Sequence, residues 1–298
     1  MSLLQKFNNI LFVLNPISGD ISKDDVKQLM QEYCKTNNLQ SEIYATTGHD
    51  DEQALQVLLQ KGFDLVVAIG GDGTVSLVAK TLNHGPVPLA ILPQGSGNGL
   101  SKDLKIPQDI PSALNIIQDG KIKAIDSLEI NGHPAFHLCD LGFNARIVKL
   151  FCEGETRGPG AYAKIAFQEY MAYQPFTYQI KTDQETFEGP AFMLTIANAN
   201  AFGSNAAINP EGEVDDGFFE ICMIEPFPGT AALGILYDLY TNSIQKSVYS
   251  RILKCKEAFI IKAPTDILQI DGEPVKVGDE ITIKLHKRSL KVLVPATA

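Results

Sequence analysis

The sequence has no tryptophan, five cysteines among 298 residues, and only 20% charged side chains. The cysteines are odd in number and scattered, with no C-x-x-C pair and no histidine at zinc spacing, so buried free thiols are expected rather than disulfides or a zinc site. No run of ~18 uncharged apolar residues is present, as a membrane-spanning helix would need, and the start lacks the blocks of a signal peptide. These absences favour a cytoplasmic protein.

The sequence also has little positive charge. Residues 1–125 carry 10 Lys and Arg against 13 Asp and Glu, residues 126–298 carry 15 against 22, and the formal net charge is −10. Binding to a nucleic-acid backbone needs clustered Lys and Arg that displace counterions, so a nucleic-acid partner is not expected.

Short apolar runs alternate with helical patterns in the first third of the chain. Strands are expected at residues 10–14, 41–45, 65–69 and 87–92, and helices at 22–33, 51–60, 74–82 and 109–119. Such alternation predicts a parallel sheet covered by helices, in which ligands bind at the carboxyl ends of the strands.

The pattern changes after residue 120. Asn131-Gly132 between two β-rich runs predicts a hairpin with a type I′ turn. Further short strands are expected at residues 177–181, 191–197, 218–224, 257–261, 266–270, 280–286 and 289–294, with helices near 161–173 and 230–240. We therefore expect an α/β chain with two domains. Residues 1–125 would form a parallel-sheet nucleotide-binding domain, and residues 126–298 an antiparallel β-sandwich, with the last strand as a candidate to return to the first domain.

A glycine-rich turn, Gly70-Gly-Asp-Gly-Thr74, directly follows the apolar run 65–69. Glycines let a backbone approach a phosphate, and the amides at a helix N-terminus attract anions. A tight strand-to-helix turn would use the same glycines. An aspartate beside a phosphate is repulsive unless a metal ion or a transferred proton intervenes, so we interpret Asp72 as linked to magnesium.

Two more polar glycine turns follow predicted strands. Residues 93–99 read Pro-Gln-Gly-Ser-Gly-Asn-Gly, and residues 15–19 read Asn-Pro-Ile-Ser-Gly. Neither G-x-G-x-x-G nor the Walker sequence occurs. One such turn is weak support, but three at the same edge of one sheet favour a polyphosphate site.

A fourth candidate, Glu273, follows the run 267–270 in an Asp-Gly-Glu turn. A glutamate is ionised at neutral pH and can accept a proton from an alcohol. A solvated loop carboxylate is the simpler alternative for this residue.

Together these motifs resemble the diacylglycerol kinase catalytic-domain family of lipid kinases, which includes soluble bacterial enzymes and the sphingosine and ceramide kinases. The resemblance rests on residues 15–19, 70–74, 93–98 and 271–273, in this order. The fold it implies for the first domain is similar to that of NAD kinases, which share the Gly-Gly-Asp-Gly turn.

The resemblance implies roles for individual residues. The ATP site is expected to include Asn15, Pro16, Ile17, Ser18, Gly19, Thr46, Gly70, Gly71, Asp72, Gly73, Thr74 and Ser96. The expected catalytic residues are Glu273 as the base for the lipid hydroxyl, Asp72, and Asp126 as a further active-site aspartate. Residues 209–218 resemble the family's structural magnesium loop, with the carboxylate of Asp216 and the backbone carbonyls of Glu213 and Phe218 as ligands.

We predict a magnesium-dependent kinase that transfers the γ-phosphate of ATP to a lipid hydroxyl, with transient contact to a membrane surface and a homodimer as one possible assembly. The loop at residues 95–99 is closer to sphingoid and ceramide kinases than to many bacterial diacylglycerol kinases, which leaves the lipid open. NAD kinase activity and a non-catalytic module that binds lipid or nucleotide are the alternatives.

Overall fold

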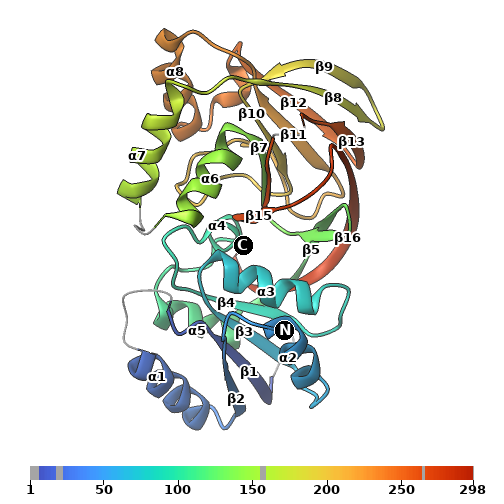
Figure 1. Ribbon diagram of the computed structural model, residues 1–298. Coiled ribbons are helices and arrows are strands. Elements are labelled where there is room, and N and C mark those ends of the chain that lie inside the picture. Colours follow the sequence, from blue (N-terminus) through green and yellow to red (C-terminus); the bar gives the residue numbers. More distant parts are fainter. Residues whose placement is uncertain (1–6, 18–22, 155–158, 264–265, 298) are drawn as a thin grey trace. The chain divides into compact units, whose positions relative to one another are not determined.

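A computed structural model describes residues 7–17, 23–154, 159–263 and 266–297 of the chain (Figure 1). The chain divides into two units. Unit 1 comprises Met1–Ile125 and Arg288–Ala298, and unit 2 comprises Asp126–Lys287. Each unit is described by itself below.

Unit 1 contains a parallel sheet. Its strands are β1 (Asn9–Leu14), β2 (Gln40–Ala45), β3 (Leu65–Gly70) and β4 (Leu89–Pro93), in the order β2-β1-β3-β4. The end of β16 (Glu280–Val294) pairs in parallel with β4 through Val292 and Leu89. Strands β1, β3 and β4 are buried at nearly every position, because parallel sheets are covered on both faces.

Helices connect these strands. They are α1 (Lys23–Thr36), α2 (Asp51–Leu59), α3 (Asp72–Leu82), α4 (Gly99–Asp103) and α5 (Ile110–Asp119). On α3, Val75, Val78, Ala79 and Leu82 are buried at the spacing of one helix face. Helix α3 contacts α2 and the strands β3 and β4, while α5 contacts β4. The apolar periodicity of the sequence therefore predicted which elements cover the sheet.

Unit 2 is built from antiparallel strands. One sheet has the order β12-β11-β10-β7-β14-β15. Its strands are β7 (Leu138–Gly142), β10 (Met193–Ala197), β11 (Phe219–Ile224), β12 (Ser250–Cys255), β14 (Leu268–Ile270) and β15 (Glu273–Val275). The other strands of the unit are β6 (His133–Ala135), β8 (Phe176–Thr182), β9 (Thr186–Ala191) and β13 (Glu257–Ile261), with the later part of β5 (Lys121–Ile130) and the earlier part of β16.

The core of unit 2 joins these two sets of strands. Leu194 and Phe219 from the first sheet share one buried cluster with Tyr178, Ile260 and Ile283 from the second set. Inward-facing side chains of two sheets pack in this way in a β-sandwich. The predicted fold class, a parallel α/β part followed by an antiparallel β-sandwich, is confirmed.

The helices of unit 2 are α6 (Phe143–Glu153), α7 (Pro159–Tyr170) and α8 (Ala232–Tyr240), with 3₁₀ turns η1 (Gly229–Ala231) and η2 (Ile244–Lys246). Helix α6 was not predicted, although Phe143, Ile147, Leu150 and Phe151 have helical spacing. The helices expected near 161–173 and 230–240 are confirmed as α7 and α8, although α7 ends three residues earlier, at Tyr170.

Several predicted strands differ from the observed ones. Residues 280–286 and 289–294 were expected as two strands but form the single strand β16, bent at Arg288, whose φ is 49°. The strand expected over 266–270 begins only at Leu268, because the carboxylate of Asp266 accepts the N–H groups of Gly142 and Ile267. The Asn131-Gly132 turn is confirmed, with φ of 48° and 84°.

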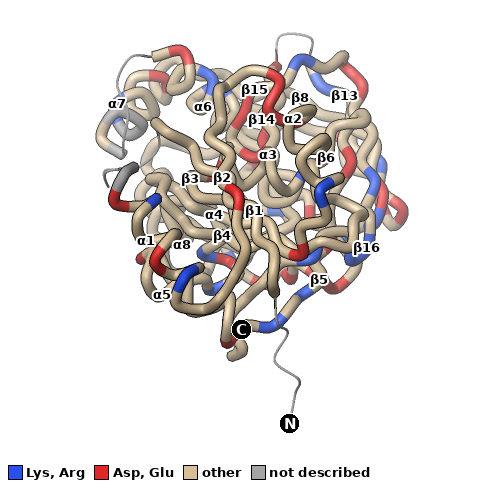
Figure 2. Tube along the Cα trace, turned by 90° about the horizontal axis from the view of Figure 1, so that it is seen from below, with Lys and Arg blue, Asp and Glu red and all other residues tan. Residues whose placement is uncertain are grey.

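Among the described residues, no helix combines the length and the apolar character needed to cross a membrane. Along the trace in Figure 2, Lys and Arg are interspersed with Asp and Glu, as the counts for the two halves of the sequence suggest.

Candidate functional site

The carboxyl ends of three strands of unit 1 lie at one edge of the sheet. Leu14 pairs with Ile69, and Gly70 pairs with Pro93, so β1, β3 and β4 end in register. The described turn residues 15–17, 70–74 and 93–99 therefore leave the sheet side by side. We call this edge the glycine edge.

The first turn is shaped by Asn15. Its side-chain oxygen accepts the N–H of Ile17 at 3.0 Å, and its own N–H donates to the carbonyl of Ile69 at 3.1 Å. The side chain of Ile17 is 91% exposed. Thr46 follows β2 at the same edge, and its N–H donates to Leu14. Ser18 and Gly19, also predicted for the site, lie outside the described residues.

The second and third turns touch through their backbones. A Cβ atom added to Gly95 would lie 2.5 Å from the Cα of Gly71, and the N–H of Gln94 donates to the carbonyl of Gly70 at 2.8 Å. Only glycine permits such an approach, so the two loops form one backbone surface. Asn98 completes it, because its side-chain oxygen accepts the N–H of Gly95.

Asp72 joins the same two loops. One carboxylate oxygen accepts the N–H of Asn98 at 2.9 Å, and the other accepts the N–H of Gly99 at 2.7 Å. Its carboxylate thus caps α4, which begins at Gly99. This contact gives the aspartate within the glycine-rich turn a structural role that the sequence did not predict.

The glycine edge also carries the start of α3. The N–H groups of Thr74 and Val75 donate to the carbonyl of Gly71, which closes the first helical turn. Gly73 and Ser96 are exposed on this edge. A helix N-terminus beside glycine turns is suited to binding phosphate groups. The structure therefore brings together the described residues that the sequence predicted for ATP.

Unit 2 presents Glu273 on a hairpin. Ile270 of β14 pairs with Glu273 of β15, and Asp271 and Gly272 between them have φ of 50° and 91°. The carboxylate of Asp271 accepts the N–H groups of Phe136 and His137 at 3.0 and 2.9 Å. The hairpin is thus fixed by Asp271, while Glu273 is exposed. This combination suits a base that must meet a bound hydroxyl.

Asp126 is fully buried in unit 2. Its carboxylate accepts the N–H of Gly217 at 2.7 Å, and its own N–H donates to the carbonyl of Val214. Its carbonyl accepts from the side-chain amide of Asn198 at 2.9 Å. These contacts attach residues 209–218 to β5. A catalytic role for Asp126 stays a prediction.

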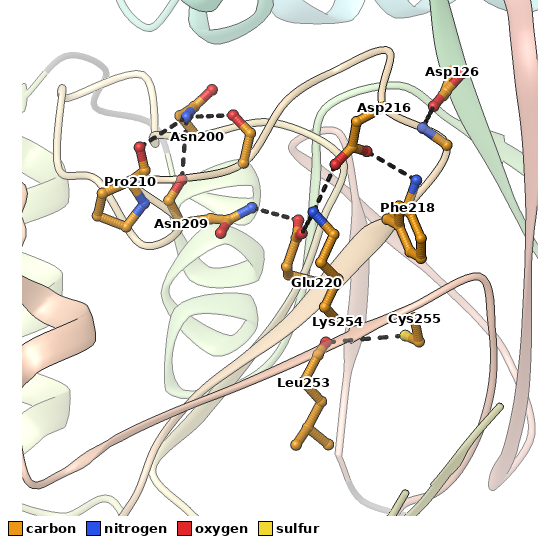
Figure 3. Close-up of polar contacts among 12 residues, drawn as sticks. Asp126, Asn200, Asn209, Pro210, Asp216, Phe218, Glu220, Leu253, Lys254 and Cys255 are labelled. Carbon is orange, nitrogen blue, oxygen red and sulfur yellow. Dashed lines mark hydrogen bonds and ion pairs between the residues drawn. The ribbon is translucent and has the colours of Figure 1, made fainter. Parts of the chain in front are cut away.

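The residues predicted as magnesium ligands lie in this attached loop. The carboxylate of Asp216 accepts the N–H of Phe218 at 2.9 Å and the ammonium of Lys254 at 2.6 Å (Figure 3). Within the described part of the chain, no three His, Cys, Asp or Glu side chains are grouped closely enough to hold a metal ion.

Sequence reasoning did not select Asp140, which is fully buried on β7. Its carboxylate accepts from the side chains of Thr195, Asn144 and Gln269. Burial raises the pKa of Asp140 to about 6. The oxygen of Gln269 accepts the N–H of Gly272 at 2.6 Å, so this buried network reaches the Glu273 hairpin. The sequence did contain a signal for Asp140, because it is a charged residue within the otherwise apolar run 138–141.

Comparison with known families divides the chain much as the fold does. Residues 9–130 match the family described as diacylglycerol kinase catalytic domain, and residues 139–294 match the YegS C-terminal NAD kinase beta sandwich-like domain. An uncharacterised protein of Synechocystis is 26% identical over 99% of this chain and 72% of its own length. A diacylglycerol kinase of Staphylococcus saprophyticus is 25% identical over 88% of this chain and 87% of its own.

Two solved structures from Bacillus anthracis share the fold. One aligns with a TM-score of 0.79 and 20% identity, over 98% of this chain and 99% of the other. The second, described as a diacylglycerol kinase, aligns with a TM-score of 0.72 and 19% identity over the same shares. Because the identities are only 20% and 19%, these two structures show that the fold is shared and nothing about activity.

Proposed function

The chain belongs to the diacylglycerol kinase catalytic-domain family, and from that premise we propose that it transfers the γ-phosphate of ATP to the hydroxyl group of a lipid. The family supports lipid kinase activity in general. The choice of ATP as donor, the need for magnesium and the roles of individual residues are parts of the proposal.

The observation that carries the proposal is the glycine edge of unit 1. Residues 15–17, the two glycine-rich turns at 70–74 and 93–99 and the N-terminus of α3 meet there. Gly71 and Gly95 approach each other too closely for any side chain. Backbone amides at such an edge can hold a polyphosphate without a dedicated lysine. We therefore propose that the phosphates of ATP bind at residues 15–17, 70–74 and 95–99.

Glu273 is the proposed base. In phosphoryl transfer a base mainly orients the attacking hydroxyl, while charge on the phosphoryl group is neutralised by amides and by Mg²⁺ that accompanies ATP. Both oxygens of Asp72 already accept backbone N–H groups, so we propose that Asp72 orders the phosphate loops and meets magnesium through water. The lipid would be reached by transient contact with a membrane surface.

The test is a lipid panel. Purified protein is incubated with γ-labelled ATP, Mg²⁺ and mixed micelles of diacylglycerol, sphingosine or ceramide, and a parallel sample contains NAD. We expect label in one lipid class. Label in NADP would favour an NAD kinase, and no product from any acceptor would favour a non-catalytic binding module.

The Glu273→Gln variant is run beside the wild type in that assay. Loss of a general base costs roughly 10²- to 10⁴-fold in rate, so kcat should fall by that factor. Because Glu273 is exposed, the melting temperature should not change. Glu280→Gln, another exposed glutamate of unit 2, is the matched control and should keep full activity. Full activity in Glu273→Gln would remove this residue from the base role.

A further inference from the structure

A lysine lies where the family resemblance places a structural cation. Lys254 is on β12, directly opposite Glu220 of β11 in the strand register. Its ammonium lies 2.6 Å from the carboxylate of Asp216 and 3.3 Å from that of Glu220. Figure 3 shows the ammonium between these two carboxylates. One positive charge thus bridges two acidic residues, one in the 209–218 loop and one on the adjoining strand.

The neighbouring oxygens of the loop accept N–H groups. The second oxygen of Glu220 accepts the side-chain amide of Asn209 at 2.8 Å. The amide of Asn200 donates to the carbonyls of Asn209, Pro210 and Gly212 at 3.2, 3.4 and 2.8 Å. These three carbonyls and this oxygen of Glu220 are thus directed at side-chain amides (Figure 3).

This donor set does not fit a divalent cation. Magnesium binds oxygen ligands at about 2.1 Å, so an ion on the oxygen of Asp216 that meets Lys254 would lie within about 5 Å of the ammonium. A second ammonium, that of Lys256, is 4.7 Å from the centre of the Phe218 ring, and that of Lys254 is 4.9 Å from it. Two positive charges beside the loop oppose the entry of a third cationic group.

We propose that the ammonium of Lys254 takes the place of the structural cation in this chain, so that the 209–218 loop needs no divalent ion. The loop also carries Gly217, whose N–H donates to the buried carboxylate of Asp126. Lys254 therefore fixes the loop whose Gly217 N–H binds the carboxylate of Asp126. This inference concerns folding and metal content, so it can fail while the proposed kinase activity stands.

The first experiment uses the unmodified protein without nucleotide. After treatment with a chelator and desalting, its magnesium and calcium content is measured, and its melting temperature is recorded with and without millimolar Mg²⁺. We expect no retained metal and a melting temperature that Mg²⁺ does not change. About one retained Mg²⁺ per chain would overturn the proposal. A rise in melting temperature with Mg²⁺ that Asp216→Asn abolishes would overturn it too.

The second experiment removes the ammonium. Lys254→Met keeps an unbranched side chain, one heavy atom shorter, but leaves Asp216 and Glu220 without this counter-charge. The melting temperature in chelator should therefore fall by about 2–5 °C. Mg²⁺ should now restore part of this loss, because the freed carboxylates can bind it. Lys254→Arg should behave as the wild type.

Lys256→Met is the matched control. It removes a nearby positive charge and the same kind of contact with Phe218, but not the contact with Asp216. Its melting temperature should not respond to Mg²⁺. If Lys254→Met is as stable as the wild type, the lysine does not replace a cation. If that variant does not fold, the metal content of the wild type decides.

Discussion

Two aspartates, one in each unit, are held in the same way in different settings. Asp72 accepts the N–H groups of Asn98 and Gly99, and Asp271 accepts those of Phe136 and His137. In both cases a carboxylate takes two successive backbone N–H groups from a distant segment. Each aspartate also belongs to a motif that indicates phosphoryl transfer.

The difference lies in burial and in the distance spanned along the chain. Asp72 is half-buried and binds residues 26 and 27 positions away, whereas Asp271 is 8% exposed and binds residues 135 and 134 positions away. Asp72 joins the turn at residues 70–74 to the turn at residues 93–99. Asp271 joins the β14–β15 hairpin to residues 136–137, which lie between β6 and β7. An acidic residue in such a motif can therefore hold loops in place. Asp271 is the more buried of the two, so its loss should lower the free energy of unfolding more than the loss of Asp72.

The largest effect is expected at Asp271. In Asp271→Ala the buried N–H of Phe136 and the half-buried N–H of His137 lose a charged acceptor. The alanine must also keep a φ of 50°. We expect the free energy of unfolding to fall by about 3 kcal/mol. Urea denaturation measures this change, and the kinase assay should show an additional loss, since the hairpin that carries Glu273 is released.

Asp271→Asn is the matched variant for that measurement. Asparagine tolerates a positive φ and keeps one acceptor oxygen, so it should lose about half as much. Equal stability of Asp271→Ala and the wild type would show that the two hydrogen bonds do not hold the hairpin.

A smaller effect is expected at Asp72. In Asp72→Asn one N–H group of residues 98–99 keeps an acceptor and the other faces an amide, so we expect a loss of about 1–2 kcal/mol by urea denaturation. The apparent KM for ATP should rise, because the loop at residues 95–99 loses an anchor. Asp25→Asn, an exposed site on α1, is the control and should show neither change.

The same variant can break the comparison. If Asp72→Asn unfolds with the free energy of the wild type but has lost kinase activity, Asp72 acts on magnesium or phosphate and does not hold the loops. The parallel with Asp271 would then be one of geometry alone.

The glycine edge was predictable because its parts are local. Each turn follows an apolar strand by one or two residues, and the parallel order of the strands brings their ends together. The described residues of the three turns could therefore be placed at one edge of the sheet from the sequence. The contact between Gly71 and Gly95 could not, because it depends on how two loops pack after the strands have paired.

Unit 2 was less predictable because its site residues depend on contacts between distant segments. The Asp-Gly-Glu turn is readable as a tight hairpin, yet nothing near residue 271 indicates Phe136 as its partner. The same holds for Lys254, which follows Asp216 by 38 positions and meets it only because β11 and β12 are paired. Helix α6 was missed although its apolar spacing was present, since it follows β7 without a loop.

The smallest effect concerns Asp140, a third aspartate that extends the comparison. Among the described residues, no backbone N–H donates to its carboxylate. Side chains of Thr195, Asn144 and Gln269 are its donors, and burial raises its pKa to about 6. The unfolded value is near 3.9. The folded protein therefore binds this proton more tightly, and the stabilisation is complete below about pH 4 and is lost as the pH rises through 6.

Between pH 5 and pH 7 this group should cost the folded state about 1 kcal/mol. Asp140→Asn cannot titrate. The asparagine oxygen can still accept from Asn144 and Gln269, while its amide donates to the Thr195 hydroxyl, so the variant should lose that part of the pH dependence in urea denaturation at the two pH values. Asp279→Asn, at an exposed position, should keep it. An unchanged slope in Asp140→Asn would mean that side-chain donors stabilise a buried carboxylate as well as backbone N–H groups do. Aspartates held by backbone N–H groups, such as Asp72 and Asp271, would then not differ in this respect from one held by side chains.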